Sequence, residues 1–270
     1  MISRRAFLVG AGAAATVAAV GVDTFGIEPR WLDVAEVPWP VPNLPLSAEG
    51  MRIAHVTDVH LQGIGRRASR LLRELQASRC QLVILTGDLL DRPWFVETVR
   101  TFIAAIRATV PRVIAVFGNW EHQCWVPLEK VAAMYASAGA ELLCNQSTLV
   151  EGLRFVGSDD DMSGYAKHHD CAKEVRDGEI TFYLSHSPGF LSVLLPPVRY
   201  AGIFSGHTHG GQAQLFGYAP FLPLGSGPYR AGHYDTQWGP LYVSRGTGTS
   251  TVVGRFMCRP ELPIYTLVRG

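Results

Sequence analysis

The chain has few cysteines, and none of them are closely spaced. Its 270 residues include five, with no Cys-x-x-Cys pair among them: Cys80, Cys124, Cys144, Cys171 and Cys258. An odd, scattered set of cysteines argues against both a disulfide framework and a zinc-finger site. We therefore expect these residues to be buried free thiols.

Long runs of Lys or Arg are also absent, and the overall charge is close to neutral. There are 24 basic and 23 acidic residues, which gives a formal net charge of +1. A protein that follows a nucleic-acid backbone needs a basic track, so this balance argues against nucleic acid as a partner. Hydrophobic residues make up 47% of the chain, enough for one sizeable core in a single large domain.

The N-terminus carries a long uncharged, Ala- and Gly-rich stretch, from Ala6 to Val22. It follows Arg4 and Arg5, so residues 1–23 have the layout of an export signal, and the apolar part is short for a membrane span of about 20 residues. The sequence SRRAFL resembles a twin-arginine export signal. We expect export to the periplasm or cell envelope, with a retained N-terminal membrane anchor as the alternative to cleavage.

Residues 24–49 contain several Pro and Trp residues without a helical period, which predicts an extended linker or a strand laid along the domain surface. Residues 50–270 form the predicted domain. Its first half alternates short β-type runs with helical patterns, which is typical of βαβ units and a largely parallel sheet. The predicted strands are 52–56, 82–86 and 113–117, and helical patterns lie at 68–75, 96–108 and 127–139.

The second half is richer in strand. Predicted strands lie at 154–158, 180–185, 202–206, 240–244 and 263–268, and the clearest helix candidate is 189–195. These patterns predict an α/β fold of the mixed α+β kind. A mixed sheet, or two packed sheets, would have helices on the outside.

Side chains that can bind a metal follow five of these strands: Asp58, His60, Asp88, Asn119, His186, His207 and His209. In open α/β sheets, ligands bind beyond the carboxyl ends of the strands. Any one of these residues alone would fit a structural histidine or an ordinary turn. Five strand ends together favour one site, because burying so many polar groups without partners would cost several kcal/mol.

The donor atoms of this set indicate which metals it suits. Carboxylate, imidazole and amide oxygen without thiolate suit Mn, Fe, Zn or Co. Seven ligands are too many for one tetrahedral ion, but they suit two ions that share a carboxylate. Two metals about 3.5–4 Å apart stabilise both the attacking and the leaving oxygen of a phosphoryl transfer. We predict two divalent ions, with manganese favoured and zinc or iron as alternatives.

In chain order, the motifs DVH, GDLLD, GNWE, LSHSP and GHTHGGQ resemble the calcineurin-like metallophosphoesterase superfamily, from about Met51 to the C-terminus. The GHTHGGQ motif and the C-terminal LYVSRGTGTS and RPELPIYTL segments further resemble exported or membrane-attached bacterial phosphodiesterases. That branch includes cell-wall-associated enzymes and hydrolases of UDP-diacylglucosamine. No Tyr follows the Gly-Asp motif, which disfavours the purple acid phosphatases.

This resemblance implies a two-sheet β-sandwich flanked by helices, with a dinuclear metal site at the strand ends. It implies that Asp58, His60, Asp88 and His209 hold one ion. Asp88, Asn119, His186 and His207 would hold the other, so that Asp88 bridges the two. A metal-bridging hydroxide would then attack phosphorus.

The implied activity is that of a phosphodiesterase or pyrophosphohydrolase. Its substrate would be a small-molecule or lipid-linked phosphate ester of the cell envelope, and contact with a membrane surface would fit such a substrate. The alternative is a degenerate member that binds metal or a phosphoester without turnover.

One position departs from the family pattern. The family has His directly after the Asn, where it donates a proton or contacts phosphate, and this chain has Trp120 there. Either His122 takes over this role, or Trp120 forms a wall for an apolar or stacked part of the substrate. We favour the wall.

Three other segments could carry function. For GSDDD at 157–161 we expect a solvated turn in preference to a calcium-like or substrate-side loop, because the spacing of a calcium hand is missing. For His168 and His169 we expect surface positions. For residues 216–234, rich in aromatics, Pro and Gly, we expect a covering loop, with a substrate groove or a membrane contact as alternatives.

Overall fold

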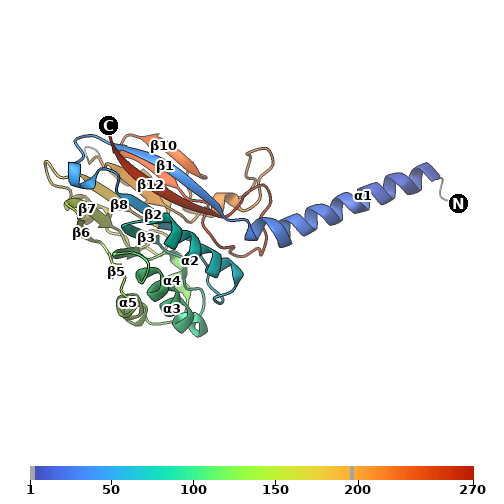
Figure 1. The fold of residues 1–270 in the computed structure, drawn as a ribbon, viewed down its shortest axis with the longest axis horizontal. Helices are drawn as coiled ribbons and strands as arrows, with labels where there is room; N and C mark the ends of the chain where they lie inside the picture. Colours follow the sequence, from blue (N-terminus) through green and yellow to red (C-terminus); the bar gives the residue numbers. More distant parts are fainter. Residues whose placement is uncertain (1–3, 195–197) are drawn as a thin grey trace.

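The computed structural model describes residues 4–194 and 198–270. Two six-stranded sheets lie against each other, and helices cover the outer face of the first sheet (Figure 1). The predicted mixed α/β fold, with two sheets flanked by helices, is confirmed. All five cysteines are free thiols, four of them buried and Cys144 half-buried.

The first sheet has the order β1–β12–β2–β3–β4–β5. Strands β2 to β5 are parallel to one another, whereas β12 is antiparallel to β2 and parallel to β1. Its strands are β1 (Asp33–Val41), β12 (Glu261–Arg269), β2 (Arg52–Val56), β3 (Leu82–Thr86), β4 (Arg112–Val116) and β5 (Glu141–Leu142). The helices between the parallel strands are α2 (Arg66–Ser78), α3 (Val96–Arg107) and α5 (Leu128–Ser137).

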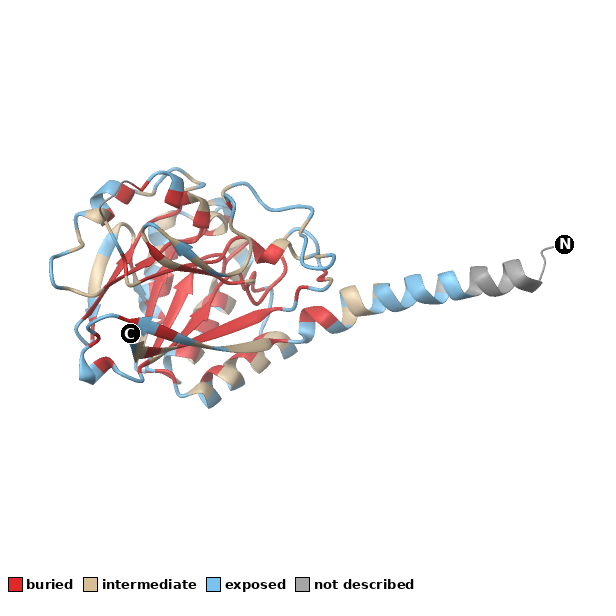
Figure 2. Cartoon of the chain, turned by 90° about the horizontal axis from the view of Figure 1, so that it is seen from above, coloured by how far each residue is buried: buried red, intermediate tan, exposed pale blue. Residues whose placement is uncertain are grey.

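This sheet is buried on both faces, which explains the continuous apolar runs of its central strands. Along β3 the side chains alternate between two cores, as the pleat of a strand requires. Leu82 and Ile84 pack between the two sheets, and Val83 and Leu85 pack with the helices. The burial-coloured view in Figure 2 shows these strands as buried through the centre of the domain.

The second sheet has the order β10–β11–β9–β8–β7–β6. Strands β11, β9, β8 and β7 are parallel, and the edge strands β10 and β6 pair antiparallel with β11 and β7. Its strands are β10 (Gly232–Thr236), β11 (Gly239–Val243), β9 (Gly202–Ser205), β8 (Thr181–Leu184), β7 (Leu153–Gly157) and β6 (Gln146–Val150). A short helix, α6 (His168–Ala172), lies between β7 and β8.

The helix predicted at 189–195 is wrong. A 3₁₀ turn, η5 (Pro188–Ser192), stands there, and residue 195 lies outside the described residues. Gly189 donates its N–H to the carbonyl of Gly225 at 2.7 Å, and a side chain at Gly189 would clash with that carbonyl. Contact with a distant loop has therefore replaced the regular helical bonds.

Within the predicted linker, residues 33–41 form β1, an edge strand of the first sheet, so the strand alternative describes this part. Trp39 and Val41 are buried between the two sheets. The Trp39 indole N–H donates to the carbonyl of Ala201, at the start of the second sheet, over 2.9 Å. Before β1 the chain forms a π-helical turn, η1 (Asp23–Ile27), and a 3₁₀ turn, η2 (Glu28–Arg30).

Helix α1 (Arg4–Val22) projects away from the domain, and its described side chains are largely exposed (Figures 1 and 2). Within the part of the chain that the structure describes, no helix combines the length and apolar character needed to cross a membrane. The export signal predicted for residues 1–23 stays a prediction.

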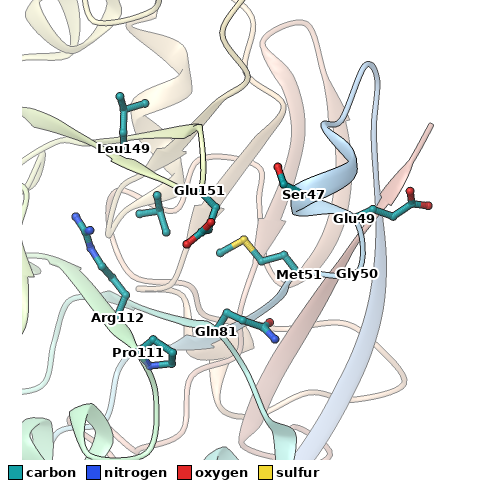
Figure 3. A pocket seen from close by; sticks show the side chains of 10 residues that line it. Ser47, Glu49, Gly50, Met51, Gln81, Pro111, Arg112, Leu149 and Glu151 are labelled. Carbon is teal, nitrogen blue, oxygen red and sulfur yellow. The ribbon is translucent and has the colours of Figure 1, made fainter.

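The two ends of the sheets differ in chemistry. A pocket of about 510 Å³ lies at the ends where β2, β3 and β4 begin, lined by Met51, Gln81 and Arg112 (Figure 3). The predicted metal ligands all follow strand carboxyl ends and therefore lie at the other end. We place the functional site there, away from the pocket in Figure 3.

Candidate metal centre

Six of the seven predicted ligands form two buried clusters. Asp58, His60 and His209 make one cluster, and Asp88, His186 and His207 make the other. Within each cluster the candidate ligand atoms lie within 4.8 Å of one another. Asp58, His60 and Asp88 follow strands of the first sheet, and the other three follow β8 and β9 of the second. The centre therefore lies where the carboxyl ends of both sheets meet.

Asp88 lies between the two clusters. Its Oδ2 is 3.2 Å from His186 Nε2 in its own cluster and 3.7 Å from His60 Nε2 in the other. In the first cluster, Asp58 Oδ1 is 3.3 Å from His209 Nε2. A carboxylate in the position of Asp88 can face two ions at once, as the resemblance implied.

Hydrogen bonds fix which nitrogens of His186 and His207 are free. His186 Nδ1 lies 2.7 Å from the carbonyl of Thr86, and His207 Nε2 lies 2.6 Å from the carbonyl of Leu224. A ring nitrogen next to a carbonyl must donate, so the other nitrogen of each neutral ring carries a lone pair. Those nitrogens, His186 Nε2 and His207 Nδ1, are 3.1 Å apart. Two lone pairs at this distance repel each other unless a cation or proton lies between them.

His60 repeats this arrangement, whereas His209 Nδ1 makes no hydrogen bond. His60 Nδ1 is 2.7 Å from the Asp91 carboxylate, which orients the ring and leaves Nε2 free. That Nε2 faces His209 Nε2 at 3.1 Å. Asp91 belongs to the GDLLD motif, but its role in orienting His60 is visible only in the structure.

A buried polar atom without a partner adds the seventh predicted ligand to the donor set. Among the described residues, Asn119 Oδ1 is buried and makes no hydrogen bond. An unsatisfied buried group costs about 1–3 kcal/mol, so such atoms need an explanation. Asn119 begins α4 (Asn119–Gln123) and offers an amide oxygen beside Asp88. Nitrogen and oxygen donors without thiolate, in two adjoining clusters, fit two divalent metal ions.

The electrostatics of the clusters favour positive charge. Burial opposes ionisation of Asp88, but His186, His60 and the Trp120 N–H together lower its pKa to about 2. Burial also opposes the charged form of His186, yet the Asp88 and Asp58 carboxylates raise its pKa well above the usual value. Asp58 itself has a raised pKa, chiefly because it is fully buried. A cation would relieve the cost of burying two carboxylates side by side.

The backbone at the ligands is strained. Asp58, His60, Asp88, His207 and His209 all have φ between 45° and 69°, a region that residues other than Gly rarely adopt. Such residues cost about 1–3 kcal/mol each and persist only when their surroundings hold them. The N–H groups of Asp58 and His60 donate to the carbonyls of Gly87 and Asp88, both at 3.0 Å, which links the two strand ends.

Glu121, which was not predicted as a site residue, holds the loops around Asp88 together. Its buried carboxylate accepts the N–H groups of Asp88 and Leu89 at 2.8 Å, Leu90 at 3.1 Å and Gly118 at 2.9 Å, and the Tyr135 hydroxyl at 3.0 Å. It therefore ties the loop after β3 to the loop after β4. The acidic position of the family pattern G-N-H-[ED] was the available signal for this residue.

A cavity of about 610 Å³ opens beside the clusters. One wall is formed by metal-site residues and Trp120, whose ring meets His60 edge-on at 5.8 Å between centroids. The lining also includes the apolar residues Phe221, Leu222, Pro223, Val252 and Phe256. The cavity can hold an apolar group attached to a phosphate at the metal centre.

His122 lies outside the set of residues that line this cavity. Its Nε2 bonds the Asp159 carboxylate at 2.8 Å, and its ring stacks on Tyr165 at 4.7 Å between centroids. Burial opposes its charge, but the bond to Asp159 and the nearby negative charges raise its pKa. The structure thus places Trp120 at the cavity and His122 on Asp159, and the roles of both residues stay predictions.

Two minor expectations are wrong. GSDDD is no solvated turn, because Asp159 and Asp160 are buried at the carboxyl end of β7 and bond within the domain. His168 is buried as well, with its ring 3.0 Å from both the Tyr183 hydroxyl and Asp161, whereas His169 is exposed as expected. Packing of the β7–α6 connection against β8 explains both results.

Comparison with known proteins agrees with this geometry. The family described as calcineurin-like phosphoesterase matches residues 51–211. The chain is 27% identical to the uncharacterized metallophosphoesterase YkuE of Bacillus subtilis, over 98% of both chains. It is 27% identical to a transmembrane protein with metallophosphoesterase domain of Danio rerio, over 85% of this chain and 56% of that protein.

Among solved structures, phosphopantetheinyl hydrolase (PptH) from Mycobacterium tuberculosis is similar with a TM-score of 0.44 and 10% identity. The match covers 78% of this chain and 96% of that one. The family match spans more than half of this chain and contains all the predicted metal ligands. This protein belongs to the calcineurin-like phosphoesterase family.

Proposed function

We propose that this protein is a two-metal phosphodiesterase or pyrophosphohydrolase that acts on a lipid-linked phosphate ester of the cell envelope. The pair of buried ligand clusters around Asp88 carries the proposal of metal-dependent hydrolysis. The apolar residues that line the cavity support a substrate with an apolar portion.

The residues of the site have different roles: some would hold the metal ions, some orient the ligands, and others line the cavity. When bound, two divalent ions would supply charge neutralisation at the phosphate and an activated water, with manganese the favoured metal. Asp88 faces both clusters, and Asp91 and the Thr86 carbonyl orient His60 and His186. Trp120 lines the cavity beside Asp88 and Asn119.

The missing family histidine restricts the substrate. The Trp120 indole N–H is a donor only and does not titrate in the ordinary range, so it cannot act as a general acid. A good leaving group needs little protonation, whereas a poor alkoxide needs much. This favours a pyrophosphate link or another activated ester as the bond that is cleaved.

The decisive test combines metal analysis with turnover. Purified protein should contain two divalent ions per chain and should hydrolyse a soluble aryl phosphodiester when manganese is added. Changing Asp88 to Ala should remove both ions and nearly all activity, because this residue serves both clusters. One ion or none in active protein would contradict the two-metal proposal.

A degenerate, non-catalytic member is the alternative, and Trp120 is the observation that favours it. Loss of a general acid alone lowers a rate by about 10²–10⁴-fold and leaves electrostatic stabilisation in place. All the presumed metal ligands are present, so we favour turnover. Metal-loaded protein that binds the diester without hydrolysing it would establish the alternative.

The roles of Trp120 and His122 can be distinguished with substrates that differ in the pKa of their leaving group. We expect His122→Ala to keep most activity on aryl diesters, whose leaving groups need no proton. Trp120→Ala should mainly weaken binding of a substrate with an apolar portion, seen as a raised KM. A loss in His122→Ala that grows with leaving-group pKa would make His122 the acid instead.

We also propose that the chain is exported by the twin-arginine route and acts at the envelope, attached to or in contact with the membrane. Support comes from SRRAFL and from the similarity to a family member named as a transmembrane protein. Replacing both Arg4 and Arg5 by Lys should retain the protein in the cytoplasm, as cell fractionation would show. Unchanged export would point to the ordinary secretion route.

A further inference from the structure

We propose that the face surrounding the base of α1 is a docking surface for an anionic lipid bilayer, which holds the cavity mouth at the membrane. This inference rests on the proposed function, because it states where a lipid-linked substrate would enter the cavity. Two surface patches, and the segment of chain that joins them, support the proposal.

The first patch is an apolar rim beside the cavity mouth. We define it as Phe25, Leu215, Phe216, Tyr218, Leu224 and Val253, all of which are exposed. Phe216 is 89% exposed, Leu224 83% and Val253 71%. A large exposed apolar patch on a soluble domain marks a partner or a membrane. Single exposed apolar residues would need no explanation, but these six lie on the three segments that surround one cavity.

The second patch is an arginine cluster at the start of α2. Arg30, Arg66, Arg67, Arg70 and Arg73 line one surface hollow of about 600 Å³, and no acidic residue lines it. One of these arginines has an acidic partner: Arg70 Nε lies 3.6 Å from the carboxylate of Glu74. Among the described residues, Arg66 and Arg73 have no carboxylate partner and are exposed, so their charge is available to anionic head groups, whereas half-buried Arg67 donates to the carbonyl of Val59.

The base of α1 joins the two patches. Thr24 lines the cavity, and Arg30, six residues further on, lines the arginine hollow. This segment is fixed to the domain: the Thr24 carbonyl accepts the Arg255 N–H at 2.9 Å, and the buried Glu28 carboxylate accepts the N–H groups of Met257 and Cys258. Figure 1 shows the loops at the mouth and the start of α2 on the side from which α1 projects.

A bilayer fits this combination better than a protein partner does. Apolar tips on separate loops can enter the interfacial region while arginines remain at head-group level, as in peripheral membrane proteins. The surface is continuous with α1, whose sequence from Ala6 to Val22 is uncharged. The pocket at the opposite end of the sheets, in contrast, is lined by two acidic residues, Glu49 and Glu151, and a single arginine, Arg112.

The test measures binding of the full chain to vesicles by co-sedimentation. Vesicles of phosphatidylcholine alone are compared with vesicles that also contain phosphatidylglycerol. One variant removes rim side chains (Phe216→Ser with Val253→Ser), and another removes charge (Arg66→Gln with Arg73→Gln). Matched controls at the opposite end of the sheets are Leu46→Ser with Leu149→Ser, and Arg176→Gln with Arg199→Gln, all at exposed positions. Every variant keeps α1.

We expect the charge variant to bind the anionic vesicles at least about tenfold more weakly, and added salt to weaken binding of the unchanged chain. The rim variant should lose binding to both kinds of vesicle, and both controls should bind normally. Circular dichroism would confirm that all variants are folded. Equal vesicle binding by all variants would overturn the proposal.

Two further measurements separate a bilayer from a second copy of the chain, and docking from hydrolysis. A concentration-dependent dimer that the rim variant abolishes, seen by light scattering without vesicle binding, would assign the face to a second copy and overturn the proposal. Turnover of a soluble aryl diester reports the hydrolytic site separately. Vesicle binding without turnover would refute the proposed function, and turnover without vesicle binding would refute the docking surface.

Discussion

Single residues that are not ligands set the geometry of this metal centre. Glu121 accepts four backbone N–H groups and one hydroxyl, and so holds the strained loop that carries Asp88. A strained conformation survives only where such bonds over-determine it. Ligand geometry therefore depends on a residue that need not touch the metals.

Replacement of Glu121 by Gln should test this dependence. The amide replaces one acceptor oxygen with donors that face other donors, so we expect a loss of about 1–3 kcal/mol in the free energy of unfolding. Metal affinity should fall as well, measured by titration of apoprotein with manganese. Glu129→Gln, on an exposed face of α5, serves as control. Unchanged stability and affinity would show that the loop holds its shape without Glu121.

Gly118 makes room for the same ligand. A Cβ atom at this position would clash with Asp88 Oδ1. We expect Gly118→Ala to displace the carboxylate and lower metal content sharply, while circular dichroism still shows a folded domain. Gly63→Ala is the matched control, because a Cβ there meets nothing and neither glycine has a positive φ. Full metal content in Gly118→Ala would mean that Asp88 does not need this position.

His122 should make stability depend on pH. Its folded-state pKa is raised above the usual 6.5, where burial is outweighed by Asp159. The contribution is therefore fully present below the ordinary pKa and disappears as pH rises through the raised value. The difference in unfolding free energy between the unchanged chain and His122→Ala should be larger near about pH 6 than near about pH 9. Urea unfolding at both pH values measures it, and a difference that does not change with pH would mean that the His122–Asp159 bond is a neutral one.

Among the elements, β1 shows how a segment with a weak pattern can be part of the core. Trp39 is almost fully buried between the sheets and bonds to the second sheet through Ala201. Replacing it by Ala should cost about 3–5 kcal/mol, as expected for a large buried aromatic residue. Trp94, an exposed Trp, provides the matched control. Equal small effects of Trp39→Ala and Trp94→Ala on urea unfolding would mean that β1 is only loosely attached.

The sequence predicted the elements with the strongest periodicity. Strands β2 and β3 were placed at their observed bounds, because their runs are continuous, apolar and followed by polar turns. Strands β6 and β10 were missed, since β6 is polar and half-exposed and β10 begins inside the segment expected to be a covering loop. Edge strands need apolar residues on one face only, and so give a weak signal.

The functional site, too, could be predicted from the sequence only in part. The ligands could be named because they follow strands in family motifs, and the structure gathers six of them into two clusters. The supporting contacts of Asp91, Glu121 and Asp159 could not be derived, because they join loops that are distant in sequence. The positive φ angles of five ligands could not be predicted either, because in a sequence only Gly indicates such a conformation.

Over the whole molecule, the metal centre lies between the two sheets. Each cluster takes ligands from loops after strands of different sheets, so bound ions would cross-link the layers at one end. A ligand at about 100 times its Kd contributes about 2.7 kcal/mol, and each kcal/mol shifts Tm by about 2–4 °C in a chain of this size. We expect chelation to lower Tm by about 5–10 °C, measured by calorimetry. The Asp88→Ala variant should not respond to chelator, and a response of equal size there would place the effect elsewhere.

The pairing of β1 with β12 has a consequence for the order of events during synthesis. β12 occupies the position between β1 and β2, and it consists of residues 261–269. While the ribosome is still adding those residues, β2, β3 and β4 can already pair with one another, but β1, whose neighbour in the sheet is β12, has no strand partner. β1 can thus gain its strand partner only after β2, β3 and β4, although it precedes them in the chain. An exposed β1 is then the sign of a chain that still lacks residues 261–269, and a β1 buried beside β12 is the sign of one that contains them.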